Sequence, residues 1–118
     1  MLSTLPRKSR AWAGRRNANW SVDRLIVLLQ HLLKWQFQEE RRGSSWEATI
    51  LVQRYALERH LDDNPSLKSA IPGAIERAYR DTIIEAAAET GLPRQSFPVS
   101  VPWTFNQILD EDFWPEQA

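Results

Sequence analysis

The chain has 118 residues, of which 42% are hydrophobic and 25% are charged, and its formal net charge is zero. These values predict one globular domain, large enough to build a core without disulfide staples. Since cysteine is absent, the sequence excludes disulfide frameworks, thiolate nucleophiles and zinc–sulfur sites.

Neither a targeting segment nor a membrane span is evident. The N-terminal stretch turns basic before any apolar region appears, which is not typical of a signal peptide. The longest apolar run, LIVLL at residues 25–29, is far shorter than the roughly 20 residues that cross a bilayer. With the lack of cysteine, this predicts a cytoplasmic protein without membrane contacts.

Residues 1–20 differ in character from the rest. They contain Pro6, Gly14 and scattered arginines but no sustained apolar stripe, which predicts a disordered or aberrant basic head followed by a single helical domain over residues 21–118. The last third of the chain is acidic: seven carboxylates follow Arg80, against one base, Arg94.

The first predicted helix spans residues 21–38, with Ser21 as its N-cap. Its apolar residues cover most of the circumference, which is typical of a helix in the middle of a bundle. Its polar residues share one narrow stripe that we expect to face water, with His31 beside it: Asp23, Gln30, Lys34 and Gln38. We expect Arg41, Arg42 and a left-handed Gly43 to close the helix.

The second predicted helix spans residues 45–61. Ser44, just before it, and Glu47, in its first turn, have capping-box spacing. Two apolar stripes lie on nearly opposite sides of this helix. The second stripe, with Leu51, Val52 and Tyr55, predicts either a partner or self-association surface or a face covered by the C-terminal segment.

Pro72 and Gly73 predict a kink or a second helix start, after which the third predicted helix runs to Thr90, where Gly91 ends it as a left-handed cap. Residues 97–115 then combine prolines with many aromatic side chains, which indicates a segment strapped over the bundle. Thr104 and Gln107 have capping-box spacing before a short helix. The sequence therefore predicts an all-α fold, a small helical bundle of three main helices plus short helices and a proline- and aromatic-rich C-terminal strap.

Several motifs in this order resemble a bacterial family found in cyanobacteria and proteobacteria, domain of unknown function 29: LLQHLLKWQFQ, RRGSSWEATI, NPSL, AAAETGL, and FP followed by PWTFNQILDEDFWP. The resemblance covers about residues 22–115. It implies a small all-α fold and brings no established activity, cofactor or catalytic residue. Val101 stands where relatives often place a cysteine before PW.

The N-terminal segment departs from this family, whose members usually have a helical stretch containing an acidic EIESMG-like sequence there. One choice of codons for RKSRAWAG spells that sequence one base out of phase. We therefore hypothesise that residues 1–20 are an out-of-frame reading, which the nucleotide sequence tests. In that case the core lacks one helix that packs on residues 21–38, and the basic head has no functional meaning.

The sequence offers little for catalysis or metal binding. No acid lies at helical spacing to orient His31, and His60 lies at a helix end where its charge favours the helix dipole. The two histidines have no metal-ligand spacing, and the consecutive carboxylates of DEDFW point in different directions. We predict no catalytic, metal or cofactor-binding residue, and therefore a non-enzymatic interaction or accessory module of unknown role.

The alternative is a nucleic-acid-binding protein. Its contacts would be the basic head together with four arginines around the first helical hairpin, Arg41, Arg42, Arg54 and Arg59. Neighbouring Glu47 and Glu58 weaken this interpretation, because carboxylates repel phosphate.

Overall fold

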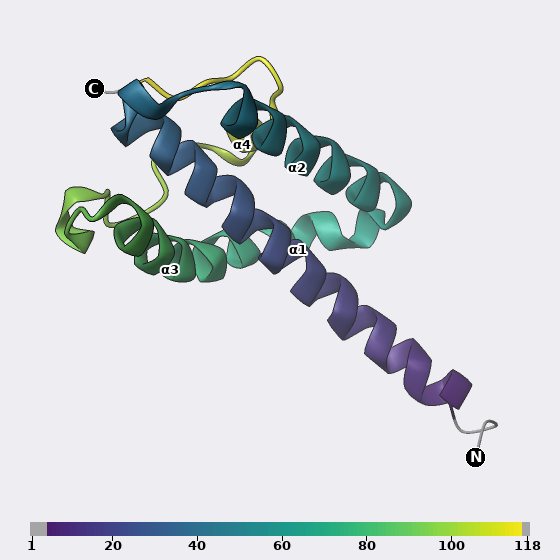
Figure 1. The fold of residues 1–118 in the computed structure, drawn as a ribbon. Helices are drawn as coiled ribbons and strands as arrows, with labels where there is room; N and C mark the ends of the chain where they lie inside the picture. Colours follow the sequence, from purple (N-terminus) through teal and green to yellow (C-terminus); the bar gives the residue numbers. More distant parts are fainter. Residues whose placement is uncertain (1–4, 117–118) are drawn as a thin grey trace.

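The computed structural model describes the backbone of residues 5–116 and the side chains of residues 20–116 (Figure 1). Four α-helices and three short 3-10 helices follow one another, and no strand occurs within residues 5–116. The predicted all-α fold is confirmed. The elements are α1 Leu5–Phe37, η2 Glu39–Arg41, α2 Ser44–Asp63, η3 Pro65–Ala70, α3 Ile71–Thr90, η4 Arg94–Ser96 and α4 Phe105–Leu109.

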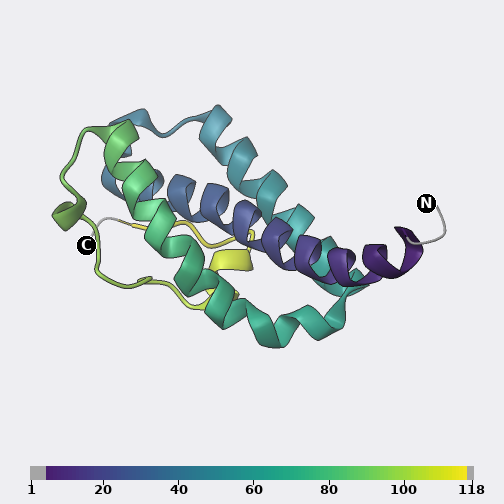
Figure 2. The same cartoon turned by 90° about the horizontal axis from the view of Figure 1, so that it is seen from below.

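Helix α1 is the centre of the bundle, as predicted. Its C-terminal half packs against both α2 and α3, which lie on different sides of it (Figures 1 and 2). Five of its side chains are wholly inaccessible to solvent: Leu25, Leu28, Leu29, Leu32 and Leu33. Ile50, Leu57 and Leu61 of α2, together with isoleucines and alanines of α3, complete the core, so α1 packs against both helices.

The prediction that the first helix begins at Ser21 is wrong. α1 begins at Leu5, and its N-terminal part extends beyond the other helices (Figure 1). No proline follows Pro6 in this stretch, so nothing ends the helical backbone before Ser21. That residues 1–20 form an aberrant or disordered head remains a prediction.

The observed helix ends agree with some of the predicted caps and contradict others. Gly91 ends α3 with φ of 75°, the left-handed conformation that glycine adopts without a Cβ penalty. Gly43 is instead extended and is itself the N-cap of α2, so Ser44 is already helical and makes no cap bond. α1 ends at Phe37, before Arg41, yet Arg42 Nε donates to the Trp35 carbonyl at 2.6 Å and so caps the helix end with its side chain.

The C-terminal segment, residues 97–115, lies against the bundle as the predicted strap. Figure 1 shows it returning past the C-terminal end of α1 to reach α2. Phe97 and Trp103 are buried, and Phe105, Phe113 and Trp114 pack against the core from its edge. Within the strap, the Thr104 hydroxyl accepts from Gln107 N at 3.1 Å and the Gln107 side chain accepts from Thr104 N at 3.0 Å, which confirms the second capping box.

No helix within residues 5–116 combines the length and the hydropathy that crossing a bilayer requires.

Candidate functional site

Arg54 is the most deeply buried charged group among the described residues, with no solvent-accessible surface. Its guanidinium donates to three backbone carbonyls of the strap: Nε to Ile108 O at 2.8 Å, and Nη2 to Phe113 O at 2.8 Å and Gln107 O at 3.4 Å. Burial lowers the pKa of Arg54, and the charge of Asp110 opposes that change. This side chain fastens the strap to α2.

A ladder of two packed indole rings between two guanidiniums begins at Arg54. Its guanidinium lies 5.4 Å from the ring centroid of Trp114, which packs on Trp35 at 4.6 Å between centroids. The Arg42 guanidinium covers Trp35 at 5.3 Å. Cation–π contacts of this kind stabilise the packed rings, so the ladder ties the strap to both α1 and α2.

The contacts of this ladder contradict part of the predicted nucleic-acid-binding site. The prediction that Arg54 contacts phosphate is wrong, because its side chain is enclosed and its Nε and Nη2 donate to backbone carbonyls of the strap. Arg42 is half-buried and bound to Trp35, which leaves Arg41 and Arg59 exposed. The side chains of the basic head lie outside the described residues.

The polar stripe of α1 faces another helix rather than water, so that prediction is wrong for Gln30 and Lys34. Both are only 8% exposed. Lys34 Nζ donates to Glu89 of α3 at 2.6 Å and lies 5.1 Å from the Trp46 ring centroid. The hydrogen bond from Lys34 holds the pKa of Glu89 below its ordinary value. A carboxylate from α3 thus supplies the partner that α1 lacks.

His31 is half-buried beside this ion pair. Its Nδ1 lies 2.8 Å from the Val27 carbonyl, which can only accept, so Nδ1 carries the proton of that bond. Burial lowers the pKa of His31, with a smaller effect from Lys34 in the same direction, while the Val27 bond and Glu89 act against it. The ring is held by the backbone, and the nearby carboxylate binds Lys34.

His60 lies in the last turn of α2 and packs on Trp20, with 4.3 Å between ring centroids. Among the side chains of residues 20–116, no group of three histidines, aspartates or glutamates is arranged to hold a metal ion. The predicted absence of catalytic, cofactor and metal residues stays a prediction.

The second apolar stripe of α2 is partly exposed, and carboxylates lie beside it. Val52 is 58% exposed and Tyr55, one turn further, is 43% exposed, while Leu51 is half-buried. The Tyr55 hydroxyl donates to Glu111 of the strap at 2.5 Å. That hydrogen bond raises the pKa of Tyr55, with smaller contributions from Glu58 and Asp112. We call this surface, Val52, Tyr55, Glu58, Glu111 and Asp112, the acidic patch.

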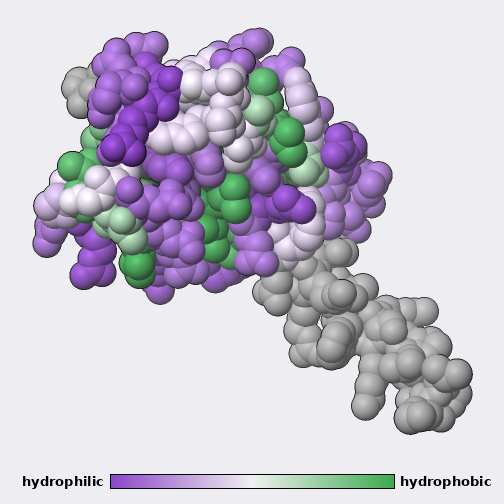
Figure 3. Space-filling view, viewed as in Figure 1, coloured by the Kyte–Doolittle hydropathy of each residue, from purple (hydrophilic) through white to green (hydrophobic). Residues whose placement is uncertain are grey.

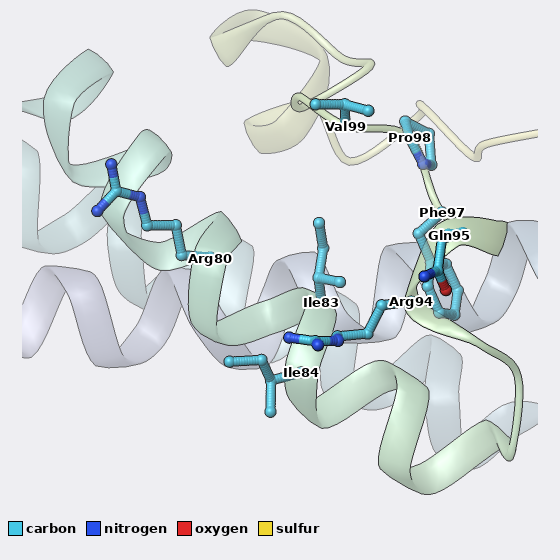
Figure 4. Close-up of a pocket in the computed structure, with 8 residues that line it drawn as sticks. All are labelled: Arg80, Ile83, Ile84, Arg94, Gln95, Phe97, Pro98 and Val99. Carbon is cyan, nitrogen blue, oxygen red and sulfur yellow. The ribbon is translucent and has the colours of Figure 1, made fainter.

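A hollow of about 540 Å³ lies between α3 and the start of the strap (Figure 4). Arg80, Ile83 and Ile84 share one face of α3, and Arg94 of η4 reaches over that helix toward both isoleucines. Ile84 is 53% exposed and Val99 98% exposed. The wall contains two arginines and no carboxylate, and we call it the basic groove.

Sequence reasoning missed the basic groove and the role of Glu89. Arg80, Ile83 and Ile84 belong to α3, and Arg94 and Val99 meet them only because the chain reverses at Gly91. Glu89 is 55 residues from Lys34, far outside any helical spacing. On the surface seen in Figure 3, hydrophobic residues form separate small patches among hydrophilic ones.

A family model described as a domain of unknown function, DUF29, matches residues 12–114, beginning upstream of Val22, where the resemblance was expected to start. No curated protein and no solved structure matches the chain.

Proposed function

We propose that this chain, which belongs to the DUF29 family of unknown function, is a non-enzymatic helical interaction module whose contact surface is the acidic patch. The proposal includes a bacterial, cytoplasmic setting. One observation carries it: although Glu111 of the strap accepts a hydrogen bond from Tyr55, the strap leaves the side chains of Val52 and Tyr55 exposed to water beside three carboxylates.

The way the molecule uses its polar groups supports this proposal. Arg54 and Arg42 bind backbone carbonyls, and Lys34 binds Glu89 across two helices, so these groups hold the bundle together. The exposed apolar side chains of α2 contribute little to that core. An apolar centre with a charged rim is the composition expected of a surface that binds a protein.

A photo-crosslinking experiment tests the proposal. Val52 is replaced by a photoreactive phenylalanine analogue in the full-length protein, expressed in its own cells, and the same analogue at Glu76, exposed on α3, serves as the matched control. We expect a crosslinked protein at position 52 that the control lacks. Its identity comes from mass spectrometry, and a second copy of this chain counts as such a protein.

The crosslinked protein is then purified and its binding measured. We expect Val52→Lys to weaken the complex at least about tenfold, because it buries an ammonium group without a partner at the contact and opposes the negative charge of the patch. If position 52 gives no product beyond the control, or if Val52→Lys leaves the affinity of the complex unchanged, the acidic patch is not the contact surface and the proposal fails.

A further inference from the structure

The acidic patch and the basic groove are opposite in charge and alike in their apolar content. The patch offers Val52 and Tyr55 among the carboxylates of Glu58, Glu111 and Asp112. The groove offers Ile84 and Val99, and its lining also includes Arg80 and Arg94. Arg59 lies one turn beyond Tyr55, and its single positive charge is smaller than the charge of the three patch carboxylates, so the net charge of the patch stays negative.

The charges of the groove are available for a partner. The Lys34–Glu89 contact is the one ion pair formed by the side chains of residues 20–116, so neither Arg80 nor Arg94 is ion-paired with a carboxylate of the described chain. Both arginines are exposed, as are Ile84 and Val99 of the same groove.

The two surfaces lie on different helices, with α1 between them (Figure 1). The patch belongs to α2 and the end of the strap, whereas the groove belongs to α3 and the start of the strap. A single molecule therefore presents both surfaces at once, on different helices.

We infer that the basic groove binds the acidic patch of a second copy of this chain. Val52 and Tyr55 of one copy cover Ile84 and Val99 of the next, and the patch carboxylates face Arg80 and Arg94. This inference rests on the proposed function, because it names a partner for the same patch. Complementary charges set the register of such a contact, and the small apolar area makes it weak and dependent on salt.

Analytical ultracentrifugation of the purified full chain, over protein concentrations up to about 1 mM, tests the inference. We expect mass to rise with concentration at about 0.05 M salt and the association to weaken at least about tenfold at about 0.5 M salt, where charges are screened. A protein that stays monomeric throughout at low salt overturns the inference.

Charge reversal identifies the two surfaces. We expect R80E/R94E alone and E58R/D112R alone each to weaken self-association at least about tenfold, because like charges then face each other. These substitutions leave the Tyr55–Glu111 bond in place. An equimolar mixture of the two variants restores association, since each altered groove meets an altered patch of opposite sign and each unaltered groove an unaltered patch.

The matched controls reverse exposed charges elsewhere: R41E/K68E for the groove variant and E39R/E40R for the patch variant. We expect both controls to associate like the unchanged protein, and all four variants to keep its thermal unfolding. If the groove and patch variants associate normally, or if their mixture fails to regain association, the inference is wrong. If the protein stays monomeric but position 52 still crosslinks to a different protein, this inference is wrong and the proposed function stands.

Discussion

Arg54 and Lys34 are two buried cations in one small bundle, and their partners differ. Arg54 is enclosed by the strap and binds three backbone carbonyls, whereas Lys34 binds one carboxylate on a neighbouring helix. The side chain of Glu89 is 54% exposed, so water can reach one end of the Lys34 pair, whereas the Arg54 side chain has no accessible surface. A buried charge therefore contributes according to how completely its partners replace water.

The largest effect expected is that of Arg54→Met. The variant retains much of the side-chain volume but leaves carbonyls of Ile108 and Phe113 without donors, and we expect it to lower the free energy of unfolding by about 3 kcal/mol. Urea denaturation followed by tryptophan fluorescence measures it. Arg59→Met, exposed on the same helix, should change stability by less than about 0.5 kcal/mol. A loss at Arg54 as small as that of the control would mean that the strap is held by its aromatic rings alone.

Glu89→Gln breaks the second cluster, with a smaller effect. It removes the charge that compensates Lys34, and because Glu89 is half in water we expect a loss of about 1 kcal/mol at neutral pH. The folded state lowers the pKa of Glu89 below its ordinary 4.5, so this contribution is fully present above that value and disappears as pH falls through the lowered pKa. Denaturation curves of the two proteins should therefore converge in acid. A difference that persists unchanged in acid contradicts the ion-pair explanation.

The two capping boxes predicted from sequence provide a similar contrast. Thr104→Ala removes a bond to the Gln107 amide and should cost about 1 kcal/mol, with Thr104→Ser retaining most of the stability. Ser44→Ala should be nearly neutral, since Ser44 is helical and caps nothing. Thermal unfolding of the three variants measures the difference. Equal losses at Thr104 and Ser44 would contradict the assignment of Gly43 as the N-cap of α2.

The smallest effect concerns His31. Because burial lowers its pKa in the folded protein below the ordinary 6.5, the unfolded chain binds the proton more readily, and stability decreases as pH falls through 6.5 toward the folded pKa. His31→Gln should flatten that slope, whereas Lys68→Gln, exposed on η3, should keep it. Urea midpoints measured from about pH 8 to about pH 5 test this. If the stability of His31→Gln still decreases with falling pH as in the unchanged protein, a group other than His31 takes up the proton.

Periodicity and turn chemistry predicted most of the fold. The leucine positions of α1, the restart of the chain near Pro72, the left-handed Gly91 and the Thr104–Gln107 box are local features, decided by residues within one or two turns of each other. Two predicted N-caps were wrong. Ser21 does not cap α1 because the residues before it continue the helix, and Ser44 does not cap α2 because Gly43 takes that position.

The candidate site was predicted only in part. The exposed stripe of Val52 and Tyr55 was visible as a second apolar face, but the choice between a free surface and a covered one depended on where the strap lies. The basic groove was not visible at all, because Arg80 and Arg94 belong to separate elements that meet after the chain reverses.

The sequence by itself determined the helices, the central place of the leucine-rich segment and the presence of an aromatic strap, since these follow from periodicity and side-chain size. Only the tertiary structure decided which polar residues are buried. Arg54 and Lys34 have nothing in their own helices to mark them as interior. Each is buried because a segment more than 50 residues away in the chain supplies the acceptors that replace water.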